Sequence, residues 1–505
     1  MTISSPGPLS PFQWYFDGWA GPRGWALAVL LVACTPAARH VVAPPQPVVS
    51  TVAAPAAARS AYLRARVLEG AGQAERAAPL WSQAIAVDPE SPWLQLAVAD
   101  RLPPAEREAR LGALVDQHPT LPEIRLAWAD AALYRRDTST AQARLAGLPD
   151  LQERAPRRHA ELGLVYGALG DLPTAWDDLV VAVRGGVCDP EVVALLTAAA
   201  LRHRRYHTAL NALAACPSAA RARARLAMNA MDALAAAESW AVVTGAAPED
   251  QEAWVGLASS RLALGDVPGA LAAARVAGDP LLLAEVLIMQ GQTGEARSWL
   301  SREESLPFAD RVARRAWAWL AVGAPDRAAA EVSASRDAPS GDLALLDLQV
   351  ALAPERAAEL IASAPIPASA RAVREAARLD RQGDPDAATR LLAEAIQAQP
   401  FPLDVADALA QRYAAAGQTD LAVAVWEAAL RVEPTDPRAL LALGLASLGR
   451  APLRTFDLAL RRLEVRPDGA SWSLLAAALL ALDRPEDAAL ARAQAALYSG
   501  GGSAP

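Results

Sequence analysis

The chain has 505 residues, a formal net charge of -8 and a hydrophobic share of 53%, much of which is alanine. All 48 basic residues are arginine, and acidic and basic residues are mixed along the chain without a basic stripe. A general nucleic-acid binder would carry such a stripe, so no nucleic-acid partner is expected. Alanine favours helix, and long Val, Ile and Thr runs are absent, so we expect an all-α protein.

Residues 1–33 have the features of an export signal. The apolar run Trp25–Ala33 is too short for the roughly 20 residues that span a bilayer, but it suits a signal peptide. It runs into Leu31–Cys34 (Leu-Val-Ala-Cys), which resembles the lipobox of bacterial lipoproteins. That resemblance implies cleavage before Cys34 and a lipid on its thiol, which would anchor the protein to a membrane. Thr35, where an aspartate would retain the protein at the inner membrane, implies an outer-membrane lipoprotein that faces the periplasm.

Two alternatives for the N-terminus stay open, because its first 22 residues are aromatic, contain Asp17 and do not match a standard leader. One is ordinary secretion, and the other is a cytoplasmic protein with an accidental apolar stretch. Residues 34–58 are rich in proline and alanine, which predicts an extended tether. Residues 499–505 are predicted to be a disordered tail.

Between these ends, residues 59–498 carry landmarks that recur at fixed spacings. Leu379, Gly383, Ala388, Leu392, Ala395 and Pro400 recur 34 residues later as Tyr413, Gly417, Ala422, Trp426, Ala429 and Pro434. A glycine is followed five residues later by an alanine at Gly72/Ala77, Gly170/Ala175, Gly265/Ala270, Gly291/Ala296, Gly323/Ala328, Gly383/Ala388 and Gly417/Ala422. Such a period predicts a stack of helix-turn-helix units.

Each landmark has a physical reason. The glycine ends the first helix of a unit, where a left-handed conformation is needed. A proline follows in the turn or at the start of the second helix, where its missing N–H costs nothing. The alanine lies where the two helices cross, and the Trp or Leu four residues later fills the space towards the next unit. The final proline ends the second helix.

These landmarks resemble the signature of the tetratricopeptide family. The resemblance implies a right-handed superhelical solenoid of about a dozen antiparallel helix hairpins over residues 59–498. The pattern is weaker in residues 92–122, 219–249 and 342–365, where units are short or lack the glycine. Those stretches are either degenerate repeats or breaks between sub-arrays.

In this family the first helices line a concave groove that holds a peptide or a partner helix. The resemblance places the following residues at exposed groove positions: Asp404, Asp407, Gln411, Val373, Ala377, Asp380, Glu252, Val255 and Ser259. The groove is therefore expected to be apolar with acidic points. Lysine is absent and Asn occurs only at Asn211 and Asn229, so the family's capture of a C-terminal carboxylate is not expected.

We find no catalytic block, nucleotide-binding loop, cofactor motif or metal-ligand spacing. His203 and His207 share a helix face, but the arginines around them would repel a cation. The pair Asp177-Asp178 is expected to be a solvated helix face. Cys188 and Cys216 flank one hairpin and are expected to approach disulfide range, a Cα separation of about 4.4–6.8 Å; two buried free thiols are the alternative.

The sequence therefore favours a non-enzymatic, membrane-tethered scaffold of the bacterial envelope. It would hold other proteins during assembly of an envelope, secretion or polysaccharide system. A cytoplasmic interaction or regulatory module is the second hypothesis. The third is an envelope enzyme whose catalytic site the sequence does not reveal.

Overall fold

The computed structural model describes residues 56–70, 73–119, 121–135, 137–145, 156–302, 309–334 and 343–498. Within these ranges every regular element is a helix. The predicted signal peptide, Cys34, nearly all of the tether and the predicted tail lie outside the described residues. No helix in the described ranges combines the length and the apolar character needed to cross a bilayer.

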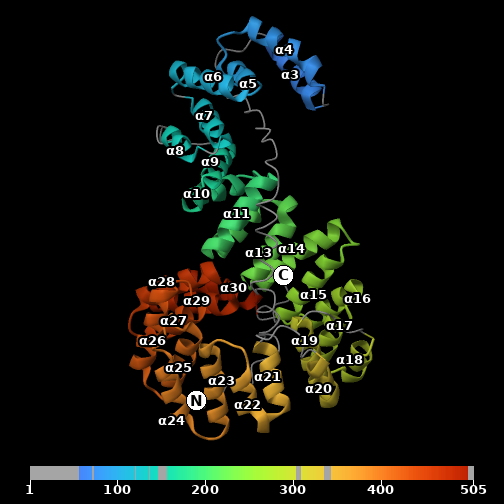
Figure 1. The fold of residues 1–505 in the computed structure, drawn as a ribbon, viewed down its shortest axis with the longest axis vertical. Helices are drawn as coiled ribbons and strands as arrows, with labels where there is room; N and C mark the ends of the chain where they lie inside the picture. Colours follow the sequence, from blue (N-terminus) through green and yellow to red (C-terminus); the bar gives the residue numbers. More distant parts are fainter. Residues whose placement is uncertain are drawn as a thin grey trace. The chain divides into compact units, whose positions relative to one another are not determined.

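Apart from α11 and α12, the described helices pair in sequence into antiparallel hairpins, α3–α4 to α9–α10 and α13–α14 to α29–α30 (Figure 1). The described part of the chain divides within α11 into two compact units, one up to Ala199 and the other from Ala200. We call them the N-terminal unit and the C-terminal unit. The helices of the N-terminal unit are α3 (Ala56–Gly70), α4 (Ala74–Val87), α5 (Pro92–Ala99), α6 (Pro104–Gln117), α7 (Pro122–Tyr134), α8 (Thr138–Leu145), α9 (Pro156–Ala168), α10 (Leu172–Arg184) and most of α11 (Pro190–His203).

The C-terminal unit contains nineteen further α-helices within the described ranges. They are α12 (Tyr206–Leu213), α13 (Ala220–Asn229), α14 (Ala233–Ala246), α15 (Gln251–Ala263), α16 (Val267–Ala277), α17 (Pro280–Met289), α18 (Thr293–Leu300), α19 (Ala309–Ala321), α20 (Pro325–Ala334), α21 (Leu343–Leu352), α22 (Ala357–Ser363), α23 (Ala368–Arg381), α24 (Pro385–Ala395), α25 (Leu403–Ala415), α26 (Thr419–Val432), α27 (Pro437–Ser447), α28 (Pro452–Val465), α29 (Gly469–Ala481) and α30 (Pro485–Leu497). Two 3₁₀ turns, η1 (Pro217–Ala219) and η2 (Pro354–Arg356), precede α13 and α22.

The predicted roles of the repeat landmarks are confirmed. Gly383 and Gly417, for example, adopt φ of 84° and 74°, in the left-handed region where glycine pays no Cβ penalty. The alanine that follows each described landmark glycine by five residues is fully buried, as Ala388 and Ala422 illustrate. A larger side chain there would push the two helices of the hairpin apart.

Three turns adopt the same left-handed conformation without glycine. Arg204, Met231 and Asp483 have φ of 52°, 56° and 57°, and each precedes a fully or almost fully buried alanine by five residues: Ala209, Ala236 and Ala488. The stretches with a weak pattern are also hairpins: α5–α6, α13–α14 and α21–α22. They are therefore degenerate repeats in the structure and not gaps in the array.

Large apolar side chains fill the spaces between hairpins. In the N-terminal unit Trp81 of α4 joins a cluster that includes Ala97 and Val98 of α5, in the next hairpin. In the C-terminal unit Trp426, only 7% exposed, joins a cluster that extends to Leu440 and Leu458 of the next hairpin. Because each cluster spans neighbouring hairpins, one hairpin alone could not bury its apolar face.

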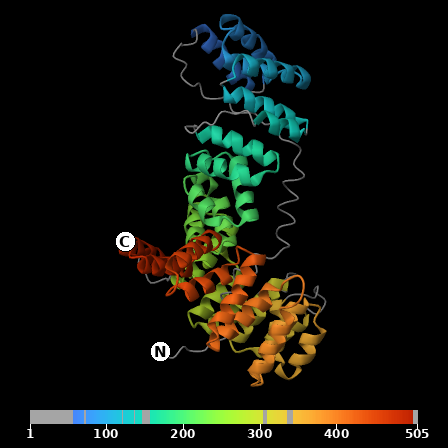
Figure 2. The same ribbon diagram turned by 90° about the vertical axis from the view of Figure 1, so that its left-hand side faces the viewer.

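The C-terminal unit follows an arc, with the first helix of most hairpins on the inner side and the second on the outer side (Figure 1). From α15 to α28, the odd-numbered helices face the inside of the arc. The last helices return to the beginning of the unit, where α28 contacts α12. Figure 2 shows the same return from the side, with the red C-terminal helices beside the green ones.

Candidate interaction surface

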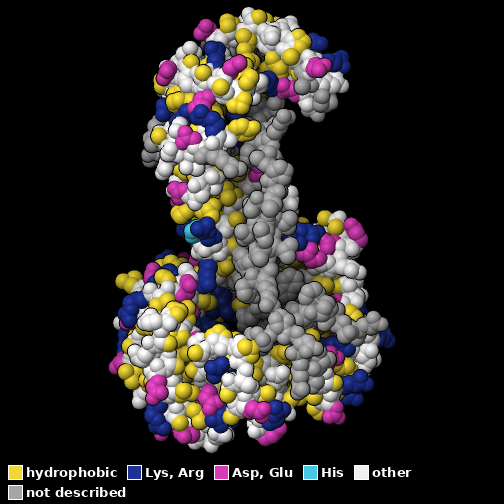
Figure 3. Space-filling view, in the orientation of Figure 1, with side chains coloured by type: hydrophobic (Ala, Val, Ile, Leu, Met, Phe, Trp, Pro, Cys, Tyr) yellow, Lys and Arg dark blue, Asp and Glu magenta, His cyan; other side chains and the backbone are white. Residues whose placement is uncertain are grey.

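The inner face of the C-terminal unit is the surface on which the sequence placed the groove. It is built from first helices, whose outward sides are covered by the second helices of the same hairpins. On the face of this unit seen in Figure 3, arginine, carboxylate and apolar side chains are all exposed. The surface therefore offers a partner both charges and apolar contacts.

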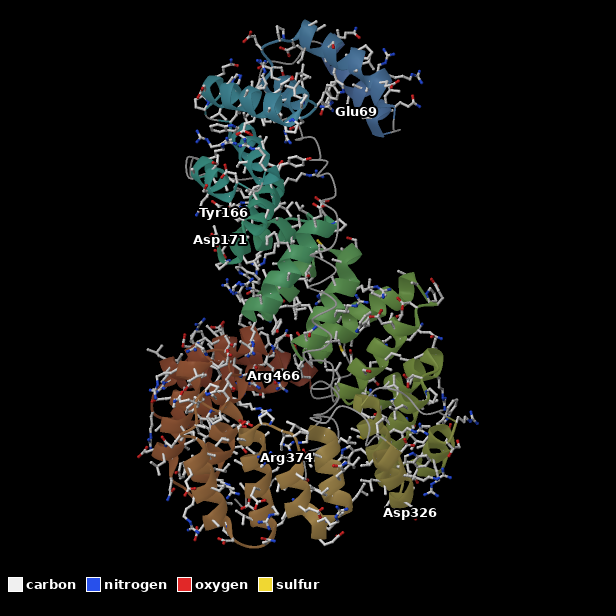
Figure 4. All side chains as sticks on the ribbon, in the orientation of Figure 1. Glu69, Tyr166, Asp171, Asp326, Arg374 and Arg466 are labelled. Atoms are coloured by element: carbon white, nitrogen blue, oxygen red, sulfur yellow. The ribbon has the colours of Figure 1, made fainter. Side chains whose placement is uncertain are left out.

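Ion pairs connect successive first helices along this face. Arg374 of α23 holds Asp347 of α21 with two hydrogen bonds of 2.7 and 2.8 Å (Figure 4). Arg314 of α19 holds Glu285 of α17 in the same two-pronged way, at 2.9 and 2.6 Å. In this geometry two N–H groups of the planar guanidinium bond to the two oxygens of one carboxylate. Each ion pair therefore fixes the distance between neighbouring hairpins.

Three of the predicted groove acids belong to the same series. Asp380 pairs with Arg412, and Asp407 lies 3.3 Å from Arg438. Glu252 accepts hydrogen bonds from Arg221 (3.1 Å) and Arg225 (2.7–3.0 Å). These carboxylates are therefore not free acidic points, because an arginine of an adjacent first helix already neutralises each one.

Burial changes the chemistry of one of these groups. Desolvation raises the pKa of Asp407 above its usual value, and the guanidinium of Arg438 opposes that shift. Gln411 is exposed and also hydrogen-bonds to Asp407. Asp407, Gln411 and Arg438 therefore form one polar cluster on α25 and α27.

The other predicted groove residues differ in how accessible they are. Asp404 is half-buried and accepts a hydrogen bond from the backbone N–H of Val405 (3.0 Å). Val373 and Val255 are half-buried as well. Ser259 is only 3% exposed, so the expectation of an exposed side chain there was wrong: the close packing of α15 encloses it.

Exposed leucines on the inner helices were not singled out from the sequence. Leu445 on α27 is 57% exposed and Leu480 on α29 is 46% exposed. The two helices are adjacent, since a Cβ added to Gly444 would meet Leu474 at 2.5 Å. Exposed leucines on neighbouring inner helices are the contacts that an amphipathic partner helix or an apolar peptide would use.

The N-terminal unit uses the same connection between first helices. Glu69 of α3 (labelled in Figure 4) binds Arg101, just after α5, through contacts of 2.7 and 2.5 Å. It also accepts a hydrogen bond from the indole N–H of Trp81 (2.9 Å), and Arg101 stacks 3.7 Å over that ring. An acid and an arginine about one repeat apart thus recur in both units.

One of the residues weighed for chemistry has a partner that the sequence did not predict. Asp178 was expected to be solvated, but it lies 2.6 Å from Nδ1 of His159, and both side chains are 19% exposed. Within the described ranges no group of three or more His, Cys, Asp or Glu could hold a metal ion. Cys188 and Cys216 are both in disulfide form, while their pairing with each other stays a prediction.

The arginines are the functional side chains that sequence reasoning missed. Their signal was present, because each lies 27–32 residues from its acid, close to the repeat length, in pairs such as Asp380/Arg412 and Asp347/Arg374. From the sequence, the arginines were considered mainly as a possible basic stripe for nucleic acid. Comparing acid and arginine positions between repeats would have found these pairs.

A family model described as tetratricopeptide repeat matches residues 403–446, which contain α25, α26 and most of α27. No curated protein matches the chain. Among solved structures, the APC/C hetero-tetramer Cut9-Hcn1 is 13% identical, covers 88% of this chain and 87% of its own, and has a TM-score of 0.29. The human IFIT1 dimer with PPP-AAAA is 17% identical, covers 68% and 91%, and has a TM-score of 0.30.

Proposed function

We propose that this tetratricopeptide-repeat protein is a scaffold that binds a segment of another protein along the inner face of its C-terminal unit. The observation that carries the proposal is the pair of exposed leucines, Leu445 and Leu480, on the adjacent inner helices α27 and α29, together with the Asp407–Arg438 ion pair between α25 and α27. An apolar strip with a polar margin suits an amphipathic helix or an extended peptide.

The ion pairs of the inner face limit what the partner can be. Asp380, Asp407 and Glu252 each have an arginine partner, so a purely basic or purely acidic peptide would gain little from charge alone. The partner is therefore expected to bind mainly through apolar side chains. One charged group of the partner could replace Asp407 or Arg438 in their ion pair. Binding should depend only weakly on salt.

Site-specific photo-cross-linking tests the surface directly. A photoreactive amino acid replaces Leu445 or Leu480 on the inner helices, and in matched controls Leu421 (50% exposed) on α26 or Leu453 (73% exposed) on α28, both outer helices. We expect partner adducts from the inner positions in cells of the source organism. Equal adduct yields from inner and outer positions would contradict the proposal.

We also propose that the scaffold is tethered to the outer membrane of a bacterial envelope through a lipid on Cys34, where it assists assembly of an envelope, secretion or polysaccharide system. The support is the sequence Leu31–Cys34 at the end of an apolar run. Palmitate labelling of wild type and of Cys34→Ser tests the anchor. Labelling lost in the variant supports the tether, whereas an unlabelled wild type in the soluble cytoplasmic fraction would favour the cytoplasmic module.

A further inference from the structure

The C-terminal unit contains a contact that a solenoid does not require. In a repeat array each hairpin touches its neighbours only. Here α12 contacts α28, which follows it by more than two hundred residues, and Tyr498 reaches Asp232. Figures 1 and 2 both show the C-terminal helices beside the beginning of the unit. We call these long-range contacts the clasp.

One half of the clasp caps a helix. The carboxylate of Glu464 on α28 accepts a hydrogen bond from the hydroxyl of Thr208 (2.9 Å) and one from its backbone N–H (3.4 Å). Thr208 is in the first turn of α12, whose own N-cap residue, Arg205, makes no side-chain capping bond. Beside it His207 packs edge-on against Trp472 of α29, at 5.7 Å. Glu464, which is distant in the sequence, thus caps the start of α12 in place of a local N-cap side chain.

The other half of the clasp holds a second helix start. The hydroxyl of Tyr498, the residue after α30, donates to Oδ1 of Asp232 at 3.0 Å. Asp232 is the N-cap of α14 and accepts the backbone N–H of Ala235 at 3.0 Å. A third contact, between Arg204 and Glu433, is looser at 3.8 Å. The last helices therefore contact the starts of both α12 and α14.

The clasp is made mostly of polar contacts, unlike the apolar clusters between neighbouring hairpins. Thr208 and His207 are half-buried, and Glu464 is half-buried too. Polar contacts of this kind exchange easily for hydrogen bonds to water, so they can open without unfolding the helices on either side. We therefore expect the clasp to open more easily than the apolar contacts between neighbouring hairpins.

We propose that the clasp is a latch, which closes the C-terminal unit around its inner face and must open before a bulky partner reaches that face. This inference rests on the proposed function for its biological use, but the latch itself can be tested without a partner. Opening would separate α28–α30 from α12–α14 and leave the apolar clusters between neighbouring hairpins in place.

The test measures access to one inner residue. In a Cys34→Ser background, a cysteine replaces Leu445 on the inner face or, as control, Leu453 on the outer face. The thiol then reacts with N-ethylmaleimide, which is small, or with a large polyethylene-glycol maleimide. Since a minor open state is typically populated at about 0.1–10%, we expect the large reagent to react about tenfold or more slowly at the inner position, after correction by the small one.

Variants of the clasp decide the outcome. Glu464→Gln combined with Tyr498→Phe should raise the corrected rate at the inner cysteine about tenfold, towards that of the outer control. Glu427→Gln, which weakens a 2.6 Å ion pair with Arg454 of the next hairpin, should not. Helix content measured by circular dichroism checks that the variants fold, and Tyr498→Phe alone is the milder variant if the double one does not.

Three results would overturn the latch. They are equal corrected rates at the two cysteines in the unaltered clasp, a rate unchanged by the clasp variants, and an equal increase from Glu427→Gln. A failure of the proposed function would give a different result. The clasp variants would then raise the maleimide reaction rate at the inner cysteine, but the yield of partner photo-adducts at Leu445 would not rise. The two ideas can therefore fail separately.

Discussion

Asp232 is a buried carboxyl group whose pKa is raised in the folded protein. It is 5% exposed, and its Oδ1 accepts the N–H of Ala235 and the hydroxyl of Tyr498, both at 3.0 Å. Burial raises its pKa to about 6, and Glu238 adds to the shift, whereas both hydrogen bonds and Arg223 oppose it. Since Oδ2 takes part in neither hydrogen bond, the protonated acid can keep both.

The direction in which stability changes with pH follows from the pKa of Asp232 in the unfolded and folded states. The unfolded value is 3.8 and the folded value is about 6, so between them the folded state binds more protons and stability falls as pH rises. The shift of about two units corresponds to roughly 3 kcal/mol at 1.36 kcal/mol per unit. About 2 kcal/mol of this falls between pH 4.5 and pH 7.5, where the folded group loses its proton.

Asp232→Asn removes the titration and keeps a good N-cap. Hydrogen exchange in the full chain at pH 4.5 and pH 7.5 measures the free energy of local opening of α14. Between these pH values the decrease in this free energy should be about 2 kcal/mol smaller in the variant than in wild type. Hydrogen exchange is the suitable assay because a repeat array need not unfold in one step.

Asp250 provides a control of opposite sign. It is also an N-cap, but the N–H of Ala253 and the guanidinium of Arg221 lower its pKa. Its stabilisation is therefore present above the unfolded pKa and is lost as pH falls through the lower folded value. Asp250→Asn should cost stability at pH 7.5 and little in strong acid. If Asp232→Asn changed the free energy of local opening of α14 equally at pH 4.5 and pH 7.5, the raised pKa of Asp232 would be refuted.

Two packing predictions concern paired positions on the helices. Gly256→Ala would place a Cβ 2.4 Å from the Trp240 ring and should cost about 1–3 kcal/mol. Gly245→Ala, with nothing within 4 Å, should stabilise α14 by up to about 1 kcal/mol, and equal effects in hydrogen exchange would contradict the clash. Leu392→Ala, at a fully buried site, should cost about 2–5 kcal/mol by the same assay. Leu421→Ala, at a half-exposed site, should change stability by less than about 0.5 kcal/mol, and a matching loss would contradict the burial argument.

The repeat architecture could be predicted because its rules are local. Gly383 and Ala388 lie five residues apart in one hairpin, so their roles follow from turn geometry and helix crossing alone. The rule missed Met231 and Asp483, because it required glycine where the structure needs only a left-handed residue. The alanine five residues later, fully buried in both cases, was the dependable half of the signal.

The interaction surface was predicted less well, because it depends on contacts between hairpins. Asp380 and Asp407 were placed on the expected helices, but their arginine partners come from the next hairpin. Ser259 shows the same limit, since its burial depends on how α15 packs against its neighbours. The clasp lies further beyond such reasoning: nothing local in the sequence connects Thr208 to Glu464.

The inner-face ion pairs join carboxylates to guanidinium groups only, since the chain contains no lysine. A guanidinium keeps its charge at any pH a cell meets, so these pairs can be broken by acid but not by base. Acetylation, which neutralises lysine, has no side-chain target here. Amine-directed cross-linkers likewise find no side-chain amine, so mapping this protein's contacts calls for reagents aimed at carboxylates, arginines or introduced thiols.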